Sequence, residues 1–172
     1  KPMKDLIIKS TFGIDYFSVK DQSFAAPELK RAESMQGYAN IGHRDGYTWL
    51  TENTATYLKS MGKHSINLLA GFTAQAYQSE YSAVGVAQFE DATGGIDAIQ
   101  EAALKQMTVS GYDAWQMLSY LARVNYNYDN RYLLTLTGRI DGSSKFGKDN
   151  KYGTFPSAAF AWRASEESFL KN

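Results

Sequence analysis

The feature that most constrains this chain is an alternation of apolar and polar side chains through Tyr120–Tyr128 that resumes through Tyr132–Ile140. A period of two places successive side chains on opposite faces of a strand, whereas a helix would mix the two sets. Between the two runs stands Asp129-Asn130, a pair of residues that tolerate positive φ and therefore mark a tight turn. The sequence predicts a long β-hairpin here.

The same alternation predicts an all-β fold, an antiparallel up-and-down meander of about six long strands. We expect strands at 5–17, 46–58, 65–80, 115–128, 131–141 and 155–164. The parity of 46–58 is ambiguous, because Glu52 suggests that even residues face water while Asn53 then falls among apolar odd residues. A short helix is expected within 96–107, where Asp97 and Gln100 resemble a capping box.

The connections alternate in length, and this asymmetry predicts a membrane barrel. Long segments are expected at 18–45, 83–114 and 142–154, with short turns between the other strands. Outer-membrane barrels combine short periplasmic turns, long outer loops and strands with one apolar face. Aromatic residues near both strand ends agree with two interfacial belts. We therefore interpret 1–172 as part of a transmembrane β-barrel, with no plug domain and with strands in contact with the lipid bilayer.

A soluble all-β carbohydrate-binding or interaction module is the alternative interpretation. Such a module also explains the alternation and the aromatic residues, but it would hide its apolar face between two sheets.

Composition and motifs argue against other classes of protein. The 18 basic and 18 acidic residues cancel, which argues against a nucleic-acid partner. No cysteine is present, and His43 and His64 lack the spacing of a metal or catalytic site. Adjacent Glu166 and Glu167 would point to opposite faces of a strand, so we interpret them as a solvated periplasmic turn. The sequence predicts no enzyme, no metal and no cofactor.

An ordered series of segments carries a family resemblance. The segments are Leu118–Tyr126, Arg131–Thr135, Arg139–Gly147, Gly153–Ser157, Ala161–Arg163 and Ser165–Asn172, with a weaker match at Lys63–Gly71. This series resembles the SusC/RagA class of TonB-linked outer-membrane transporters. The resemblance implies a large barrel around an N-terminal plug in the Gram-negative outer membrane. It also implies import of glycans or peptides, a SusD-like lipoprotein over the outer mouth, and energy from TonB. No stretch resembles the plug or a TonB box, so we expect a mid-barrel segment.

Two groups of residues are candidates for function. Arg123, Arg139, Asp141 and Arg163 fall on the polar parity and are expected to face the lumen. We favour a charge ladder or contacts to the plug over direct contact with substrate, because charges buried there should pair. The second group comprises aromatic residues expected in outer loops, namely Tyr81, Phe89, Phe146 and Tyr152. They could stack on sugars or contact the lipoprotein lid, or simply pack within the loops.

Overall fold

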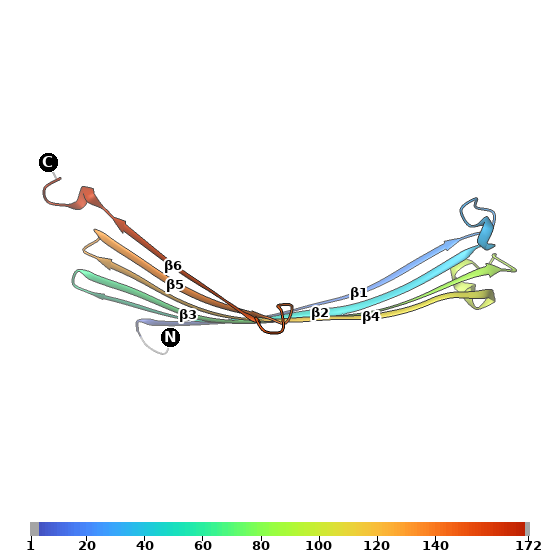
Figure 1. Ribbon diagram of the computed structural model, residues 1–172, viewed down its shortest axis with the longest axis horizontal. Helices are drawn as coiled ribbons and strands as arrows, with labels where there is room; N and C mark the ends of the chain where they lie inside the picture. Colours follow the sequence, from blue (N-terminus) through green and yellow to red (C-terminus); the bar gives the residue numbers. More distant parts are fainter. Residues whose placement is uncertain (1–3, 171–172) are drawn as a thin grey trace. The chain divides into compact units, whose positions relative to one another are not determined.

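The computed structural model describes residues 4–170, apart from the side chains at 106 and 107. Six strands form one antiparallel sheet in the order β1-β2-β3-β4-β5-β6, so each strand pairs with its neighbours in sequence (Figure 1). The strands are β1 (Leu6–Ala25), β2 (Tyr38–Met61), β3 (His64–Phe89), β4 (Ala102–Tyr128), β5 (Tyr132–Ser143) and β6 (Tyr152–Trp162). The predicted all-β meander is confirmed.

The first four strands are much longer than the ranges that the alternation predicts. They run for 20, 24, 26 and 27 residues, whereas a tilted membrane-crossing strand needs about 9–11. The added length lies in segments expected to be loops. The residues there do not separate into one apolar and one polar face; residues 85–87 of β3, for example, are successive and all buried. The period of two therefore disappears although the backbone stays extended and paired.

The short helical elements are all of the 3₁₀ type. They are η1 (Glu33–Met35), η2 (Gly95–Glu101) and η3 (Ala164–Glu166). The helix expected within 96–107 is therefore a 3₁₀ turn that ends at Glu101, and β4 begins at Ala102. Non-helical dihedrals at Ala98, with φ −116° and ψ 33°, interrupt even this turn.

The β4–β5 connection is the tight turn that the sequence predicts. Asp129 and Asn130 have φ of 54° and 56°, and the Arg131 N–H donates a 2.9 Å hydrogen bond to the Tyr128 carbonyl. Positive φ at both central residues is the geometry of a type I′ hairpin turn, whose twist matches the flanking strands.

The chain divides into two compact units. Unit 1 comprises 1–14, 49–76 and 115–172, and unit 2 comprises 15–48 and 77–114. Unit 2 has a small core of Ala39, Val86, Phe89 and Ala102, against which Phe24, Ala92, Ile96 and Ile99 pack. The large apolar side chains of unit 1 are mostly exposed. Within residues 4–170, no helix has the length and apolar character needed to cross a membrane.

Candidate functional site

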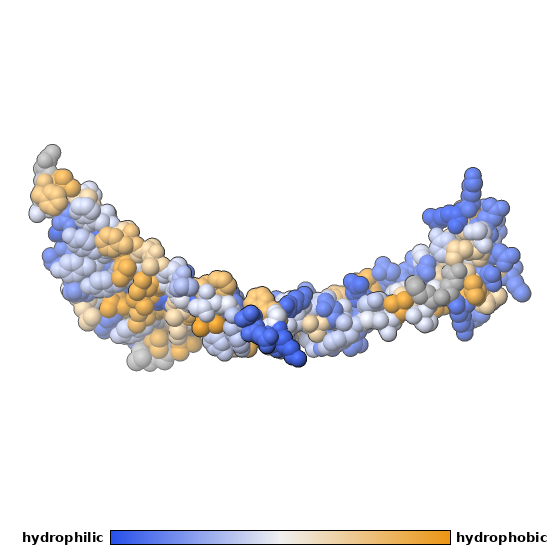
Figure 2. All heavy atoms as spheres, in the orientation of Figure 1, coloured by the Kyte–Doolittle hydropathy of each residue, from blue (hydrophilic) through white to orange (hydrophobic). Residues whose placement is uncertain are grey.

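One face of unit 1 carries an exposed apolar belt. Strand pairing places Tyr126 beside Leu134 and Leu134 beside Phe160, so all three share this face. The Phe72 ring lies 5.3 Å from the Tyr120 ring, which brings β3 onto the same face. Phe160 is 68% exposed. Hydrophobic residues accordingly gather over the part of the sheet that carries β5 and β6 (Figure 2). An apolar face of this extent needs an apolar environment.

The opposite face of unit 1 is polar. Thr135 Oγ1 donates to Asn125 Oδ1 at 2.9 Å, and Arg123 Nε donates to Thr137 Oγ1 at 3.1 Å. A groove continues this face across β1–β5. Its lining is Lys9, Thr11, Glu52, Thr54, Gly71, Thr73, Ser119, Leu121 and Arg139. Alternate residues of the same strands thus meet two different environments.

The groove resolves the ambiguous parity of β2. Glu52 lines the polar groove, so Asn53 projects on the apolar face. Two neighbours satisfy the amide of Asn53: Ser10 Oγ donates to its Oδ1 at 2.7 Å, and its Nδ2 donates to Thr51 Oγ1 at 3.1 Å. These hydrogen bonds lower the cost of placing an amide among apolar side chains.

The structure brings together some of the charged residues that the sequence singles out. Arg139 Nε donates to both carboxylate oxygens of Asp141, at 2.7 and 2.9 Å, and Arg139 Nη2 reaches Ser119 Oγ at 3.4 Å. Arg123 shares the polar face with this pair. Arg163 lies apart, just beyond the end of β6, where its Nη1 donates to the Asn130 carbonyl at 3.4 Å.

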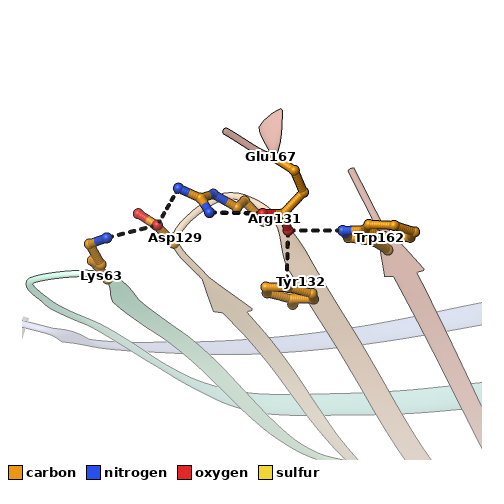
Figure 3. Close-up of polar contacts among 6 residues, drawn as sticks. All are labelled: Lys63, Asp129, Arg131, Tyr132, Trp162 and Glu167. Atoms are coloured by element: carbon orange, nitrogen blue, oxygen red, sulfur yellow. Dashed lines mark hydrogen bonds and ion pairs between the residues drawn. The ribbon is translucent and has the colours of Figure 1, made fainter. Parts of the chain in front are cut away.

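A cluster of polar side chains closes the short-turn end of unit 1 (Figure 3). At its centre, the Glu167 carboxylate accepts hydrogen bonds from Tyr132 Oη at 2.7 Å, Trp162 Nε1 at 3.1 Å and Arg131 Nη1 at 3.1 Å. We call this set of four residues the rim clasp. The hydrogen bonds from Tyr132 and Trp162, aided by the charge of Arg131, lower the pKa of Glu167.

Arg131 extends the rim clasp to a second turn. Its Nη2 lies 3.1 Å from the Asp129 carboxylate, which also receives Lys63 Nζ at 2.9 Å (Figure 3). The Asp129 N–H donates to the Lys63 carbonyl at 2.7 Å. The β2–β3 turn, the β4–β5 turn and the segment after β6 are therefore joined. The interpretation of Glu166-Glu167 as a solvated turn is wrong for Glu167, which is 7% exposed, because alternation cannot reveal contacts made beyond a strand end.

The four candidate loop aromatics occupy different environments. Phe89 is 6% exposed, and its ring packs edge-on against that of Phe24 with the ring centroids 5.5 Å apart. The Phe89 side chain is therefore packed within unit 2. Tyr81 lies in β3 with the Arg44 guanidinium 5.5 Å from its ring centroid. Tyr152 is the first residue of β6 and pairs with Gly142, whereas Phe146 is exposed in the β5–β6 loop. For Phe89, the structure therefore favours the alternative of packing within the protein.

Each of the two histidines has a polar side-chain partner. His43 Nε2 lies 2.7 Å from Asp45 Oδ2, and His64 Nδ1 lies 2.6 Å from the Tyr126 hydroxyl. Over the described part of the chain, no three His, Asp or Glu side chains gather as a metal site would require.

Sequence comparison finds several related receptors. The chain is 34% identical over 97% of its length to TonB-dependent receptor P3 of Formosa agariphila, and 36% identical over 99% to receptor P26 of the same organism. It is 39% identical over 67% of its length to TonB-dependent receptor SusC of Bacteroides thetaiotaomicron. It spans only 17%, 18% and 11% of these proteins, respectively. No family model matches.

Solved structures share the fold. The chain superposes over 99% of its length on part of the structure described as the RagAB peptide transporter, with a TM-score of 0.87 and 22% identity. The "closed-closed" state of the RagAB peptide importer gives a TM-score of 0.86 at the same identity. In each case the chain covers 19% of the matched chain.

Proposed function

This chain belongs to the SusC/RagA-type TonB-dependent receptors of the Gram-negative outer membrane, and we propose that it forms part of the wall through which such a receptor imports a nutrient. The observation that carries the proposal is the contrast between the two faces of unit 1. An apolar belt suits hydrocarbon, and the polar face behind it suits a lumen that holds water and solute. Family membership sets aside the alternative of a soluble module.

The polar face supports a structural role for its charges. Arg139 and Asp141 neutralise each other, and the Arg123 side chain is held by Thr137. The Arg139–Asp141 pair attracts neither anions nor cations strongly, because its net field is small. We propose that these residues stiffen the wall and present hydrogen-bonding groups to the plug.

We further propose an oligosaccharide or a peptide as the imported solute, with a SusD-like lipoprotein and TonB as partners. Support comes from the relatives: one is SusC, and the superposed structure is described as a peptide transporter. Tyr81, Phe146 and Tyr152 are exposed. The Tyr81 ring already faces the Arg44 guanidinium, so Phe146 and Tyr152 are the ones we propose for contacts with solute or lid. Import of a labelled oligosaccharide and of a labelled peptide, measured in cells carrying or lacking the complete receptor, distinguishes the two classes.

Two neighbouring alanines of β6 provide a matched test of the wall. Ala158 pairs with Leu136 on the apolar face, and Ala159 pairs with Thr135 on the polar face. In the complete receptor, Ala158→Arg places a charge in hydrocarbon and should destabilise the folded barrel by roughly 2–4 kcal/mol. Ala159→Arg should lower the free energy of unfolding much less, since its side chain projects into water.

The readout is the free energy of unfolding in lipid vesicles, with the amount of receptor in the outer membrane as a second measure. The assignment of the two faces is refuted if Ala158→Arg and Ala159→Arg lower the free energy of unfolding equally, or if Ala159→Arg lowers it more.

A further inference from the structure

The groove on the polar face of unit 1 is formed by residues of that unit alone. Strands β1 to β4 each contribute two alternate residues to its lining, and β5 contributes Arg139. Its volume is about 260 Å³, somewhat below the roughly 300–1,000 Å³ typical of small-ligand sites. Gly71 leaves space between Thr54 Cγ2 and Leu121 Cβ, which each lie 3.6 Å from the place that a Cβ on Gly71 would take. The groove therefore has room for a short stretch of solute.

Two opposite charges in this groove are left without a partner. Asp141 already neutralises the Arg139 guanidinium, with Arg139 Nε 2.7 and 2.9 Å from the two carboxylate oxygens. Lys9 on β1 and Glu52 on β2 are exposed, and among the residues described neither side chain forms an ion pair or a hydrogen bond. A solute that covers them removes their water. To offset that desolvation, it must bring an anion to Lys9 and a cation to Glu52.

The uncharged part of the lining fits a peptide better than a sugar. The hydroxyl groups of Thr11, Thr54 and Thr73 can each donate and accept a hydrogen bond, which matches the N–H and C=O groups of a peptide backbone. Of the described residues that line the groove, none is aromatic, so a sugar ring would find no flat apolar surface on which to stack. A neutral saccharide would also leave the two charges without counter-ions.

We propose that this groove binds a short peptide segment that carries both charges, with a carboxylate at Lys9 and an ammonium group at Glu52. The inference rests on the proposed function, because it takes the polar face of unit 1 to line the lumen. Of the two classes of solute named there, it selects the peptide. The two charges come either from the termini of a very short peptide or from side chains within a longer one, and the probes below distinguish these sources.

The test measures the binding of labelled alanylalanine to the complete receptor in nanodiscs. Two further probes each lack one charge: alanylalanine amide has no carboxylate, and N-acetyl-alanylalanine has no ammonium group. We expect Lys9→Gln to weaken the binding of alanylalanine roughly tenfold and to leave the binding of the amide within about twofold of the wild-type value. Glu52→Gln should likewise weaken the binding of alanylalanine and leave that of the N-acetyl probe unchanged.

Matched controls separate binding from folding. Lys4→Gln and Glu33→Gln remove exposed charges outside the groove and should bind alanylalanine like the wild type. Gly71→Ala adds a methyl group at ordinary contact distances of 3.6–3.8 Å, so the unfolding midpoint should not change while the narrower groove binds the peptide more weakly. A probe with both charges in side chains, acetyl-glutamyl-lysine amide, is measured in parallel. If it depends on Lys9 and Glu52 and alanylalanine does not, the groove binds the interior of a longer peptide.

Three outcomes would overturn the proposal. Lys9→Gln and Glu52→Gln leave the binding of both kinds of peptide probe unchanged; or each variant weakens all probes alike, whichever charge a probe lacks; or the receptor binds a labelled neutral trisaccharide of glucose and no peptide. The third outcome leaves the proposed function standing, because import of an oligosaccharide remains. If cells that carry the wild-type receptor import neither a peptide nor an oligosaccharide, the proposed function itself fails.

Discussion

The Tyr132 hydroxyl donates a 2.7 Å hydrogen bond to the carboxylate of Glu167, a residue that follows the end of β6. Trp162 is paired with Tyr132 across β5 and β6, on the same face of the sheet, and its Nε1 donates to the same carboxylate. Interfacial tyrosines and tryptophans need a polar partner for the wet end of the ring. Here Glu167 supplies that partner for two rings at once, and Arg131 balances its charge.

Removal of the Glu167 carboxylate should loosen the short-turn end of the sheet. In the complete receptor, we expect the midpoint of thermal unfolding to fall in Glu167→Gln and further in Glu167→Ala, because the amide oxygen still accepts hydrogen bonds while alanine accepts none. Ser168→Ala, at an exposed neighbouring position, is the control. An unfolding midpoint for Glu167→Ala equal to that of the control would show that the rim clasp adds nothing to stability.

The rim clasp should also make stability depend on pH. Because the pKa of Glu167 in the folded protein lies below its unfolded value of about 4.3, its contribution is complete above that pH. The contribution is lost as the pH falls through the lower, folded pKa. The difference in unfolding free energy between wild type and Glu167→Gln should therefore be constant from pH 8 to about pH 6 and shrink below about pH 4. A difference that grows on acidification would contradict the assignment.

Replacing Asn130 by valine should destabilise the protein, whereas replacing it by glycine should have little effect on stability. Its φ of 56° lies in the left-handed region, where a β-branched residue is strained. Asn130→Val should lower the free energy of unfolding by roughly 1–3 kcal/mol, whereas Asn130→Gly should change it much less, although it loses the 2.8 Å hydrogen bond from Asn127 Nδ2. Chemical denaturation of the complete receptor measures both values. Similar costs for the two variants would mean that the turn changes its backbone conformation.

Gly111 and Tyr81 should behave as a coupled pair. A Cβ on Gly111 would overlap the Tyr81 ring, so Gly111→Ala should force the ring aside and cost about 1–3 kcal/mol. In a Tyr81→Ala background, Gly111→Ala should leave the free energy of unfolding nearly unchanged, because the ring that the new Cβ would overlap is absent. A double-mutant cycle measures the coupling. Additive effects would indicate that the ring moves without cost.

Arg139 should matter little for stability. Its side chain is half exposed and faces Asp141 on the same strand, so Arg139→Gln should change the free energy of unfolding by less than about 1 kcal/mol. We expect import by the complete receptor to stay near the wild-type rate, since the pair belongs to the wall. A large loss of import without loss of stability would assign Arg139 to the path of the solute.

Alternation of apolar and polar residues predicts strands and their faces well where one face meets an apolar environment and the other meets water. The hairpin around Asp129 and the shared face of Leu134 and Phe160 follow directly from it. The same signal fails where apolar and polar residues do not separate onto two faces, as at the successive buried residues 85–87 of β3. Much of unit 2 is therefore predicted as loop. It also leaves Asn53 ambiguous, because a polar residue on an apolar face is stabilised by neighbours such as Ser10 on another strand.

The amino-acid order alone therefore determined the all-β meander, the position of the β4–β5 turn and the family, because these depend on local periodicity and on short ordered motifs. Only the tertiary structure decided that Glu167 is the centre of the rim clasp and that Phe89 is buried. Each of these depends on contacts between residues distant in sequence, and periodicity along one strand carries no information about what lies across the sheet or beyond its end.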